Sequence, residues 1–149
     1  MGGPVIRRAV AGDISAILIL LVDDDLGKLR ESTETSAYEQ AFAEIDLDPN
    51  QLLAVMDLEG HVVGCLQLTF IPGLSHGGMR RGQIEAVRIA RSLRGQGLGT
   101  ALMRWAIDQC HSRGCGLVQL MTDKRRACAR RFYHGLGFTP SHEGMKLKL

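Results

Sequence analysis

The feature that most constrains this chain is a run of alternate glycines, "RGQGLG", at positions 94–99. It follows the apolar run "QIEAVRIARSL" and precedes a segment in which Leu98, Ala101, Leu102 and Trp105 recur at helical spacing. A strand that enters a helix through glycines leaves the N–H groups of the first helical turn open, and the helix dipole favours an anion there. Glycine also removes the Cβ atoms that would keep a pyrophosphate away from those donors. The pattern alone suits a phosphate site or a plain strand-to-helix turn.

The bulk composition is that of one soluble globular domain covering residues 1–149. A net charge of +2, from 18 basic and 16 acidic residues, is too balanced to indicate a nucleic-acid partner. The longest apolar run, 14–22, is too short to span a membrane, and no secretory leader opens the chain, so we expect a cytoplasmic protein. The four cysteines form no C-x-x-C pair, which predicts buried, reduced thiols with no metal: Cys65, Cys110, Cys115 and Cys128.

Periodicity predicts the order of the elements. Apolar residues at every third or fourth position indicate helices, and short alternating or apolar runs indicate strands. The expected strands cover 4–10, 51–56, 61–70, 83–90 and 117–121, and the expected helices cover 13–21, 35–45, 98–113 and a last one from 122 or 123 to near "HGLGF". The tail "MKLKL" at 145–149 alternates and predicts an edge strand. This order indicates an α+β fold with a mixed sheet rather than a doubly wound one.

Two local expectations follow from the same periodicity. Asp13 is expected to cap the helix that it opens, because its carboxylate can accept from free N–H groups of the first turn. Along 83–90, strict alternation assigns one face of the strand to Ile84, Ala86 and Arg88 and the other to Glu85, Val87 and Ile89.

Two motifs give the chain a resemblance to a known family. "RSLRGQGLGTALM" resembles the acetyl-coenzyme A signature Q/R-x-x-G-x-G/A of the GNAT superfamily of N-acetyltransferases, with Arg94, Gly97 and Gly99 in its three fixed places. "ARRFYHGLGF", at 129–138, is similar to the family's closing motif A-x-x-F-Y-x-x-L-G-F. The resemblance is dense over 84–138. It implies a GNAT-like α+β fold, with a mixed, mostly antiparallel central sheet flanked by about four helices.

The resemblance further implies acetyl-CoA as the cosubstrate, with its pyrophosphate on the backbone of the glycine loop. In the family, the strand before the loop splays from its neighbour and pairs with the pantetheine arm. Many members carry an asparagine seven residues before the motif tyrosine, where this chain has Arg126, so Arg125 or Arg126 is expected to meet a phosphate instead. The expected cofactor-binding residues are Val87, Ile89, Arg94, Gly95, Gln96, Gly97, Leu98, Gly99, Thr100 and Arg126.

Acyl transfer to an amine needs two proton movements, because an alkyl amine with a pKa of about 10.4 is mostly protonated at neutral pH. Glu85, on the strand that leads into the loop, is the candidate base, with a salt-bridge partner as the alternative. Tyr133 is the candidate acid for the leaving thiolate, since the family's tyrosine commonly faces the coenzyme sulfur; the alternative is a packed aromatic. His61 and His76 are weaker candidates.

The acceptor is expected to be a primary amine, of a small molecule or a protein, that attacks directly in a ternary complex. An acidic group would suit a cationic amine, or is simply a solvated face: Asp23, Asp24, Asp25, Glu31 and Glu34. The alternative function is a non-catalytic acyl-CoA-binding sensor or regulatory module. Nucleic-acid binding through "DKRRACARR" is a weak third, so no nucleic-acid or membrane partner is expected. Family members are often dimers, and the alternating tail would suit pairing or exchange between two copies.

Overall fold

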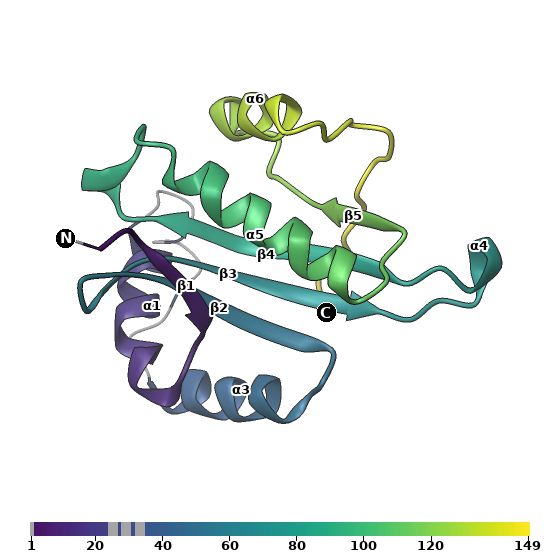
Figure 1. Ribbon diagram of the computed structural model, residues 1–149. Helices are drawn as coiled ribbons and strands as arrows, with labels where there is room; N and C mark the ends of the chain where they lie inside the picture. Colours follow the sequence, from purple (N-terminus) through teal and green to yellow (C-terminus); the bar gives the residue numbers. More distant parts are fainter. Residues whose placement is uncertain (1, 24–26, 28–30, 32–34) are drawn as a thin grey trace.

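The chain folds around one five-stranded sheet with helices on both faces (Figure 1). This computed structural model describes residues 2–23, 27, 31 and 35–149. The strands are β1 (Val5–Arg8), β2 (Gln51–Leu58), β3 (His61–Ile71), β4 (Arg81–Ile89) and β5 (Leu117–Leu120). The helices are α1 (Ile14–Val22), α3 (Thr35–Leu47), α4 (Ser75–Gly78), α5 (Leu98–Ser112) and α6 (Ala127–Gly135), with 3-10 turns η1 (Ala11–Asp13) and η2 (Arg91–Leu93).

The strands lie in the order β1-β2-β3-β4-β5. Each neighbouring pair is antiparallel except β4 and β5, which run parallel. The parallel pair is connected through α5, the crossover that a parallel connection requires. The predicted α+β class, with a mixed and mostly antiparallel sheet and about four longer helices, is confirmed.

Two apolar clusters hold the layers together, one on each face of the sheet. The larger joins α5 to the sheet through Leu102 and Ala106, one helical turn apart, against Leu68 of β3; all three are 0% exposed. The second joins α1 to the other face through Ile17 and Leu20. The two faces of β4 are therefore distinct environments, and this distinction determines what its side chains can reach.

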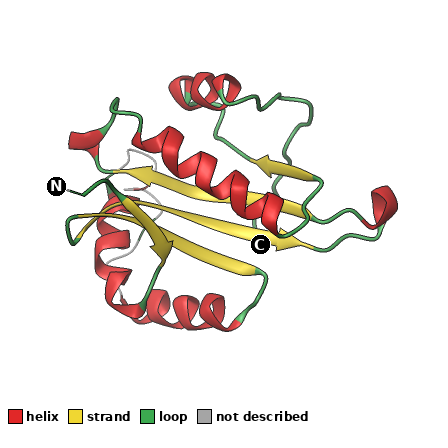
Figure 2. Cartoon of the chain, viewed as in Figure 1, coloured by secondary structure: helices red, strands yellow, loops and turns green. Residues whose placement is uncertain are grey.

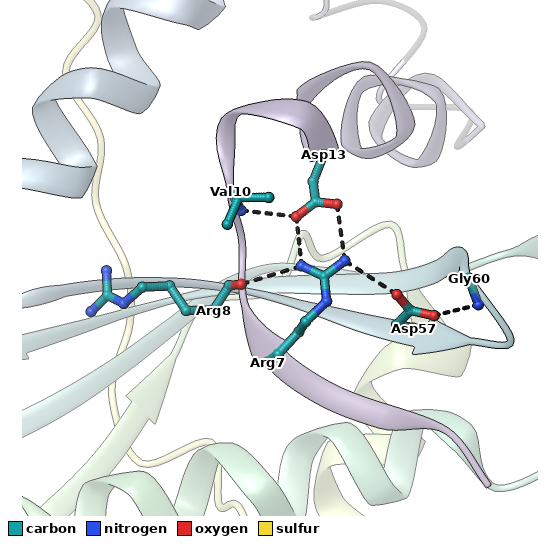
Figure 3. Close-up of polar contacts among 6 residues, drawn as sticks. All are labelled: Arg7, Arg8, Val10, Asp13, Asp57 and Gly60. Carbon is teal, nitrogen blue, oxygen red and sulfur yellow. Dashed lines mark hydrogen bonds and ion pairs between the residues drawn. The ribbon is translucent and has the colours of Figure 1, made fainter. Parts of the chain in front are cut away.

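Arg7 of β1 links three elements at the edge of the sheet (Figure 3). Its Nη1 and Nη2 donate to Asp13 Oδ2 and Oδ1 at 2.7 and 3.1 Å, and Nη2 also donates to Asp57 Oδ2 of β2 at 3.2 Å. The Val10 N–H donates to Asp13 Oδ2 at 2.8 Å. The prediction that Asp13 caps the following helix is wrong, because this carboxylate makes no hydrogen bond to the first turn of α1. The Arg7 hydrogen bond lowers the pKa of Asp13.

The cysteines are all free, and their burial differs from one to the next. Burial raises the pKa of Cys65 and of Cys110 to about 12, so both stay protonated thiols at neutral pH. Cys115 is half-buried. Cys128 is exposed on α6, so the expectation of a buried thiol is wrong there.

The C-terminal tail, residues 139–149, differs from its prediction. Figure 2 shows the chain after α6 as loop, and no strand forms at 145–149. Met145, Leu147 and Leu149 are exposed instead of packed. The predicted edge strand is therefore absent. Apolar and charged residues do alternate along the tail, but this alternation does not specify a neighbouring strand with which the tail could pair. Within the described residues, no helix is both long and apolar enough to cross a membrane.

Candidate active site

The candidate site begins where β4 loses its neighbour β5. The parallel pairing runs from Arg81 opposite Leu117 to Ile84 opposite Leu120, and β5 ends there. β4 continues to Ile89 with only β3 beside it. Glu85 is therefore the first residue of β4 beyond its last pair with β5, and the expected splaying of the two strands stays a prediction.

A bulge at Ala86 changes the faces of β4. Ala86 has φ 55°, in the left-handed region that non-glycine residues rarely adopt, and the pairing with β3 shifts between Cys65 and Gln67. Beyond the bulge, Val87 and Ile89 pack against the α5-side cluster that also contains Ile84. The predicted faces of β4 are therefore wrong, because one extra residue moves every later side chain to the opposite side.

Glu85 and Arg88 share the face that looks toward α1. Glu85 lies opposite Gln67 of β3, and Arg88 lies opposite Cys65. Gln67 and Cys65 are two residues apart on β3, so their side chains point to the same face. Glu85 and Arg88 lie opposite them and share that face, because the bulge adds one residue between the two on β4. Glu85 is exposed, and among the described residues it has no ion-pair partner, so its salt-bridge reading finds no support.

On the face of the sheet that carries Glu85, side-chain amides and one hydroxyl form hydrogen bonds between neighbouring strands. Gln67 Nε2 and Thr69 Oγ1 each donate to Gln51 Oε1 at 3.0 Å. Gln119 Nε2 donates to Gln83 Oε1, also at 3.0 Å. These contacts span β2 to β5 and make a polar floor beside the candidate base.

Tyr133 lies on the opposite side, packed against the α5-side cluster. Its ring centroid lies 5.3 Å from that of Phe132 and 6.1 Å from that of Phe138. Burial raises the pKa of Tyr133 above 10, although the positive charges of Arg126 and Arg88 oppose the shift. The hydroxyl therefore keeps its proton at neutral pH, which a general acid requires.

Arg88 is a further candidate that sequence reasoning did not select. Its positive charge opposes the rise in the pKa of both Tyr133 and Cys65, and its Nη1 donates to the Val87 carbonyl at 2.9 Å. The available signal was a single arginine inside the apolar segment "IEAVRIA". An arginine is retained in such a strand only where its charge has partners.

The glycine loop opens α5 as predicted. Gly95 and Gly97 have φ 77° and 81°, which favours glycine, and a Cβ on either would meet nothing within 4 Å. Gly97 makes no side-chain cap, and the first N–H of the helix to bond to backbone is that of Ala101, which donates to the Gly97 carbonyl at 3.1 Å. The N–H groups of Leu98, Gly99 and Thr100 precede that bond, so they remain available to an anion.

The remaining predicted residues divide around this loop. A Cβ at Gly99 would lie 3.4 Å from the Phe132 ring, so glycine there lets α5 and α6 approach closely. Arg94 Nε donates to the Ile89 carbonyl at 3.1 Å and holds the loop to the end of β4. Arg125 is paired with Asp123 at 2.8 Å, whereas Arg126, at the start of α6, is the one whose charge reaches Tyr133.

The weaker candidates lie elsewhere or have other partners. His61 is exposed at the β2–β3 turn, and His76 is exposed in α4. Asp23 contacts Arg91 at 3.5 Å, and Glu31 accepts from the Tyr38 hydroxyl at 3.4 Å. The other three acidic residues, Asp24, Asp25 and Glu34, lie outside the described residues. In the part of the chain that the structure describes, no cluster of His, Cys, Asp and Glu could hold a metal ion.

Comparison with known proteins gives consistent matches. The acetyltransferase (GNAT) family model matches residues 18–138. An aminoalkylphosphonate N-acetyltransferase of Salmonella typhimurium is 29% identical over 137 residues, covering 92% of this chain and 86% of the relative. A glucosamine 6-phosphate N-acetyltransferase of Trypanosoma brucei brucei is 36% identical over 90 residues, covering 60% of this chain and 59% of the relative.

A solved structure from Bacillus halodurans, described as a transcriptional regulator, is 45% identical and superposes with a TM-score of 0.95. The superposition covers 99% of this chain and 100% of that one.

Proposed function

Because the chain belongs to the acetyltransferase (GNAT) family, we propose that Glu85 and Tyr133 carry out the two proton transfers by which it moves an acetyl group from acetyl-CoA to a primary amine. The curated relatives are named as N-acetyltransferases, and nothing in the comparisons supports a non-catalytic acyl-CoA sensor. The observation that carries the residue roles is that Glu85 is exposed on β4 just beyond its last pair with β5, while Tyr133 packs on the other side of the sheet against the cluster that also holds Val87 and Ile89 of β4. Residues 1–149 would form one acetyltransferase domain.

The chain's own groups suit acetyl-CoA. The backbone N–H groups of Gly95 to Thr100 would hold the pyrophosphate, because the loop is open on its outer side and leads into free first-turn donors, whereas the Arg94 N–H already donates to the Arg91 carbonyl. Arg126 would meet a phosphate group. The backbone of Val87 and Ile89 would lie along the pantetheine arm, since their side chains are turned into the core. When bound, acetyl-CoA supplies a thioester carbonyl that an amine can attack and a thiolate that can leave.

Glu85 and Tyr133 would carry two of the proton movements of the transfer. The exposed Glu85 carboxylate accepts a proton from the protonated amine, directly or through water, which frees the nitrogen lone pair. The new C–N bond then forms in a ternary complex, the cationic nitrogen releases a further proton to water to become a neutral amide, and the C–S bond breaks. Tyr133 donates its proton to the departing sulfur, because burial holds that proton on the hydroxyl until the thiolate needs it.

The acceptor would be a small primary amine that also carries a phosphate or phosphonate group. Arg88 supports this class, because it lies on the same face of β4 as Glu85 and its positive charge would attract phosphoryl oxygens. Two of the curated relatives are named for acceptors of this kind, whereas a third is named as a mycothiol acetyltransferase. A cationic acceptor has less support, since Asp23 is paired with Arg91. A protein amine, a cytoplasmic location and the absence of nucleic-acid and membrane partners remain predictions.

A thiol-release assay with matched acceptor pairs tests this proposal. We expect aminoethylphosphonate and glucosamine 6-phosphate to react at least tenfold faster than ethanolamine and glucosamine, with polyamines and basic peptides slower still. Glu85→Gln should lose activity with every acceptor, whereas Glu44→Gln, an exposed glutamate on α3, should not. Arg88→Gln should remove the preference within each pair while the unphosphorylated amine serves as its internal control.

Two outcomes would count against it. Full activity in Glu85→Gln would exclude Glu85 as the base. Preferred reaction with a polyamine or a basic peptide would replace the phosphorylated acceptor with a cationic or protein amine, and would leave the acetyltransferase activity itself in place.

A further inference from the structure

A row of polar side chains crosses four strands on the face of the sheet that carries Glu85. Gln51 of β2 lies opposite Thr69 of β3, which lies opposite Gln83 of β4. Gln83 in turn lies opposite Gln119 of β5. All four residues of the row are half-buried. Gln83 comes two residues before Glu85 and ahead of the bulge, so both side chains point to the same face.

The β5 end of this row has a direction, because it ends at an arginine. Arg81 Nη1 donates to Gln119 Oε1 at 3.3 Å, and Gln119 Nε2 donates to Gln83 Oε1 at 3.0 Å. A guanidinium has donors and no acceptor, so Gln119 must turn its oxygen to Arg81 and its amide nitrogen to Gln83. Gln83 therefore turns its own oxygen to Gln119, and its Nε2 keeps two hydrogens for another partner.

The β2 end of the row has no such direction. Gln67 Nε2 and Thr69 Oγ1 both donate to Gln51 Oε1 at 3.0 Å. Turning both amides round would preserve the two hydrogen bonds, because a hydroxyl can accept as well as donate. The three groups of this half are neutral, whereas the charge of Arg81 fixes the direction of the other half.

Gln83 Nε2 is a donor beside the candidate base. Among the described residues, no hydrogen bond uses this atom. Residues two apart on a strand lie roughly 7 Å apart, so a small molecule whose amine meets the Glu85 carboxylate reaches Gln83 with a group a few bonds away. Arg88 lies beyond Glu85 in the other direction along β4, so Gln83 and Arg88 would contact different parts of that molecule.

We propose that Gln83 determines which amines the site accepts, by donating a hydrogen bond from Nε2 to a substrate oxygen that bears no hydrogen, such as an ether, carbonyl or phosphoryl oxygen. Gln119 and Arg81 are positioning residues, because they act by fixing the direction of the Gln83 amide. A group that can only donate, such as a second ammonium, finds no partner at Gln83 Nε2. This role of Gln83 rests on the proposed transfer at Glu85.

Two amines of equal length and without phosphate test the contact. Methoxyethylamine and butylamine differ only in one ether oxygen, which accepts a hydrogen bond and donates none. The measured quantity is the ratio of kcat/KM for the ether amine to that for butylamine, because the different basicity of the two amines affects this ratio equally in every variant. Gln83→Leu should lower the ratio about three- to tenfold, the effect of one lost hydrogen bond.

Gln119→Glu tests the positioning role while Gln83 stays in place. The new carboxylate still accepts from Arg81, but it cannot donate, so Gln83 turns its Nε2 toward the carboxylate and its oxygen toward the substrate. The ratio should then fall at least as far as in Gln83→Leu. Gln51→Glu is the matched control, because its carboxylate accepts from the same two donors as the amide oxygen does, and the ratio should keep its wild-type value.

Binding without transfer gives a second measurement. With CoA in place of acetyl-CoA no acetyl group is available, so the amine can only bind. Methoxyethylamine should then shift the side-chain amide resonances of Gln83 in proton–nitrogen NMR correlation spectra, whereas butylamine should not. These resonances are identified by their loss in Gln83→Leu.

Four results would overturn the proposal: an unchanged ratio in Gln83→Leu, a wild-type ratio in Gln119→Glu, an equal fall in Gln51→Glu, or Gln83 resonances that respond alike to both amines. Circular dichroism should show that the variants are folded. Since neither amine carries phosphate, the ratio is independent of any preference for phosphorylated acceptors. Absence of that preference would count against the proposed acceptor class and would leave the Gln83 contact in place.

Discussion

At the scale of single residues, position along a bulged strand and burial give the candidate groups different chemistry. Glu85 is exposed on a polar face, which suits a group that must exchange protons with a bound amine and water. Tyr133 is packed among aromatic rings, and this burial keeps its hydroxyl protonated. The candidate base and the candidate acid thus lie in the environments that their proposed roles require, Glu85 on one face of β4 and Tyr133 of α6 on the side of the other face.

Replacing Tyr133 by phenylalanine should lower kcat by about 10²- to 10⁴-fold, because the leaving thiolate then has no positioned proton donor. The packing of the ring is retained, so the KM for acetyl-CoA should change little. Since burial raises the pKa of Tyr133 above 10, the fall of wild-type kcat caused by loss of this proton should lie above pH 10. Steady-state kinetics across a range of pH measures the kcat of the variant, its KM for acetyl-CoA and the pH at which the wild-type kcat falls.

Tyr38→Phe is the control, because Tyr38 is the other tyrosine and lies on α3. It should keep wild-type kcat and pH dependence. A Tyr133→Phe variant with unchanged kcat would assign this ring to packing alone.

At the scale of elements, α5 has two ends with similar backbone geometry and different surroundings. Gly97 before its start and Gly114 after its end have φ 81° and 72°, and a Cβ on either would meet nothing within 4 Å. Only the first end has free N–H donors and the positive end of the dipole. The two glycines therefore form a natural pair for separating a binding effect from a conformational one.

Gly97→Glu should abolish the rise in melting temperature that acetyl-CoA gives the wild type, because it puts a carboxylate in the proposed phosphate site. Gly114→Glu carries the same chemical change and a comparable backbone penalty of about 1–2 kcal/mol, and should keep the acetyl-CoA shift. Differential scanning fluorimetry with and without acetyl-CoA measures both. An acetyl-CoA shift that survives in Gly97→Glu would remove the loop from the binding site.

Periodicity predicted most elements because burial on one face leaves a repeat of two or 3.6 residues in the sequence. Gly97 and Glu85 could be selected as candidates because a motif marks the first and the strand that leads into it marks the second. Asp13 was identified as a helix cap because local spacing cannot reveal that Arg7 would take both of its oxygens. The left-handed backbone of Ala86 left no trace, since alanine has no preference for it, and Arg88 was missed as a result.

At the scale of the whole molecule, Arg7 and Asp13 join the N-terminal strand to the first helical turn, and Asp57 joins both to β2. The Asp13 side chain is 9% exposed, whereas the other ion pair of β1, Arg8 with Asp46 at 4.0 Å, is 44% and 53% exposed. A partly buried, hydrogen-bonded pair contributes more to stability than a solvated one. The two aspartates should therefore respond differently to the same substitution.

Asp13→Asn should lower the free energy of unfolding at pH 7 by about 1–3 kcal/mol, and Asp46→Asn by less than about 0.5 kcal/mol. Because the folded pKa of Asp13 is depressed, its contribution is present above the unfolded pKa of about 3.9 and is lost as the pH falls through the lower folded value. The gap between the wild type and Asp13→Asn should close in that acidic range. Urea unfolding at pH 7 and below pH 4 measures it, and a gap that persists in acid would contradict the assignment.

The bulge at Ala86 also determines which side chains of β4 face each layer of helices. Before the bulge the even-numbered residues of β4 face α5, and after it the odd-numbered residues do. Deleting one residue there would turn the side chains of the later part of β4 to the opposite faces. Val87 and Ile89 would then point away from the α5-side cluster, and Arg88 would point into it. The glycine loop would then leave the end of β4 with its backbone turned to the other face of the sheet. The left-handed backbone of Ala86, a residue with no functional group, thus fixes the orientation of the glycine loop relative to the face that carries Glu85 and Arg88.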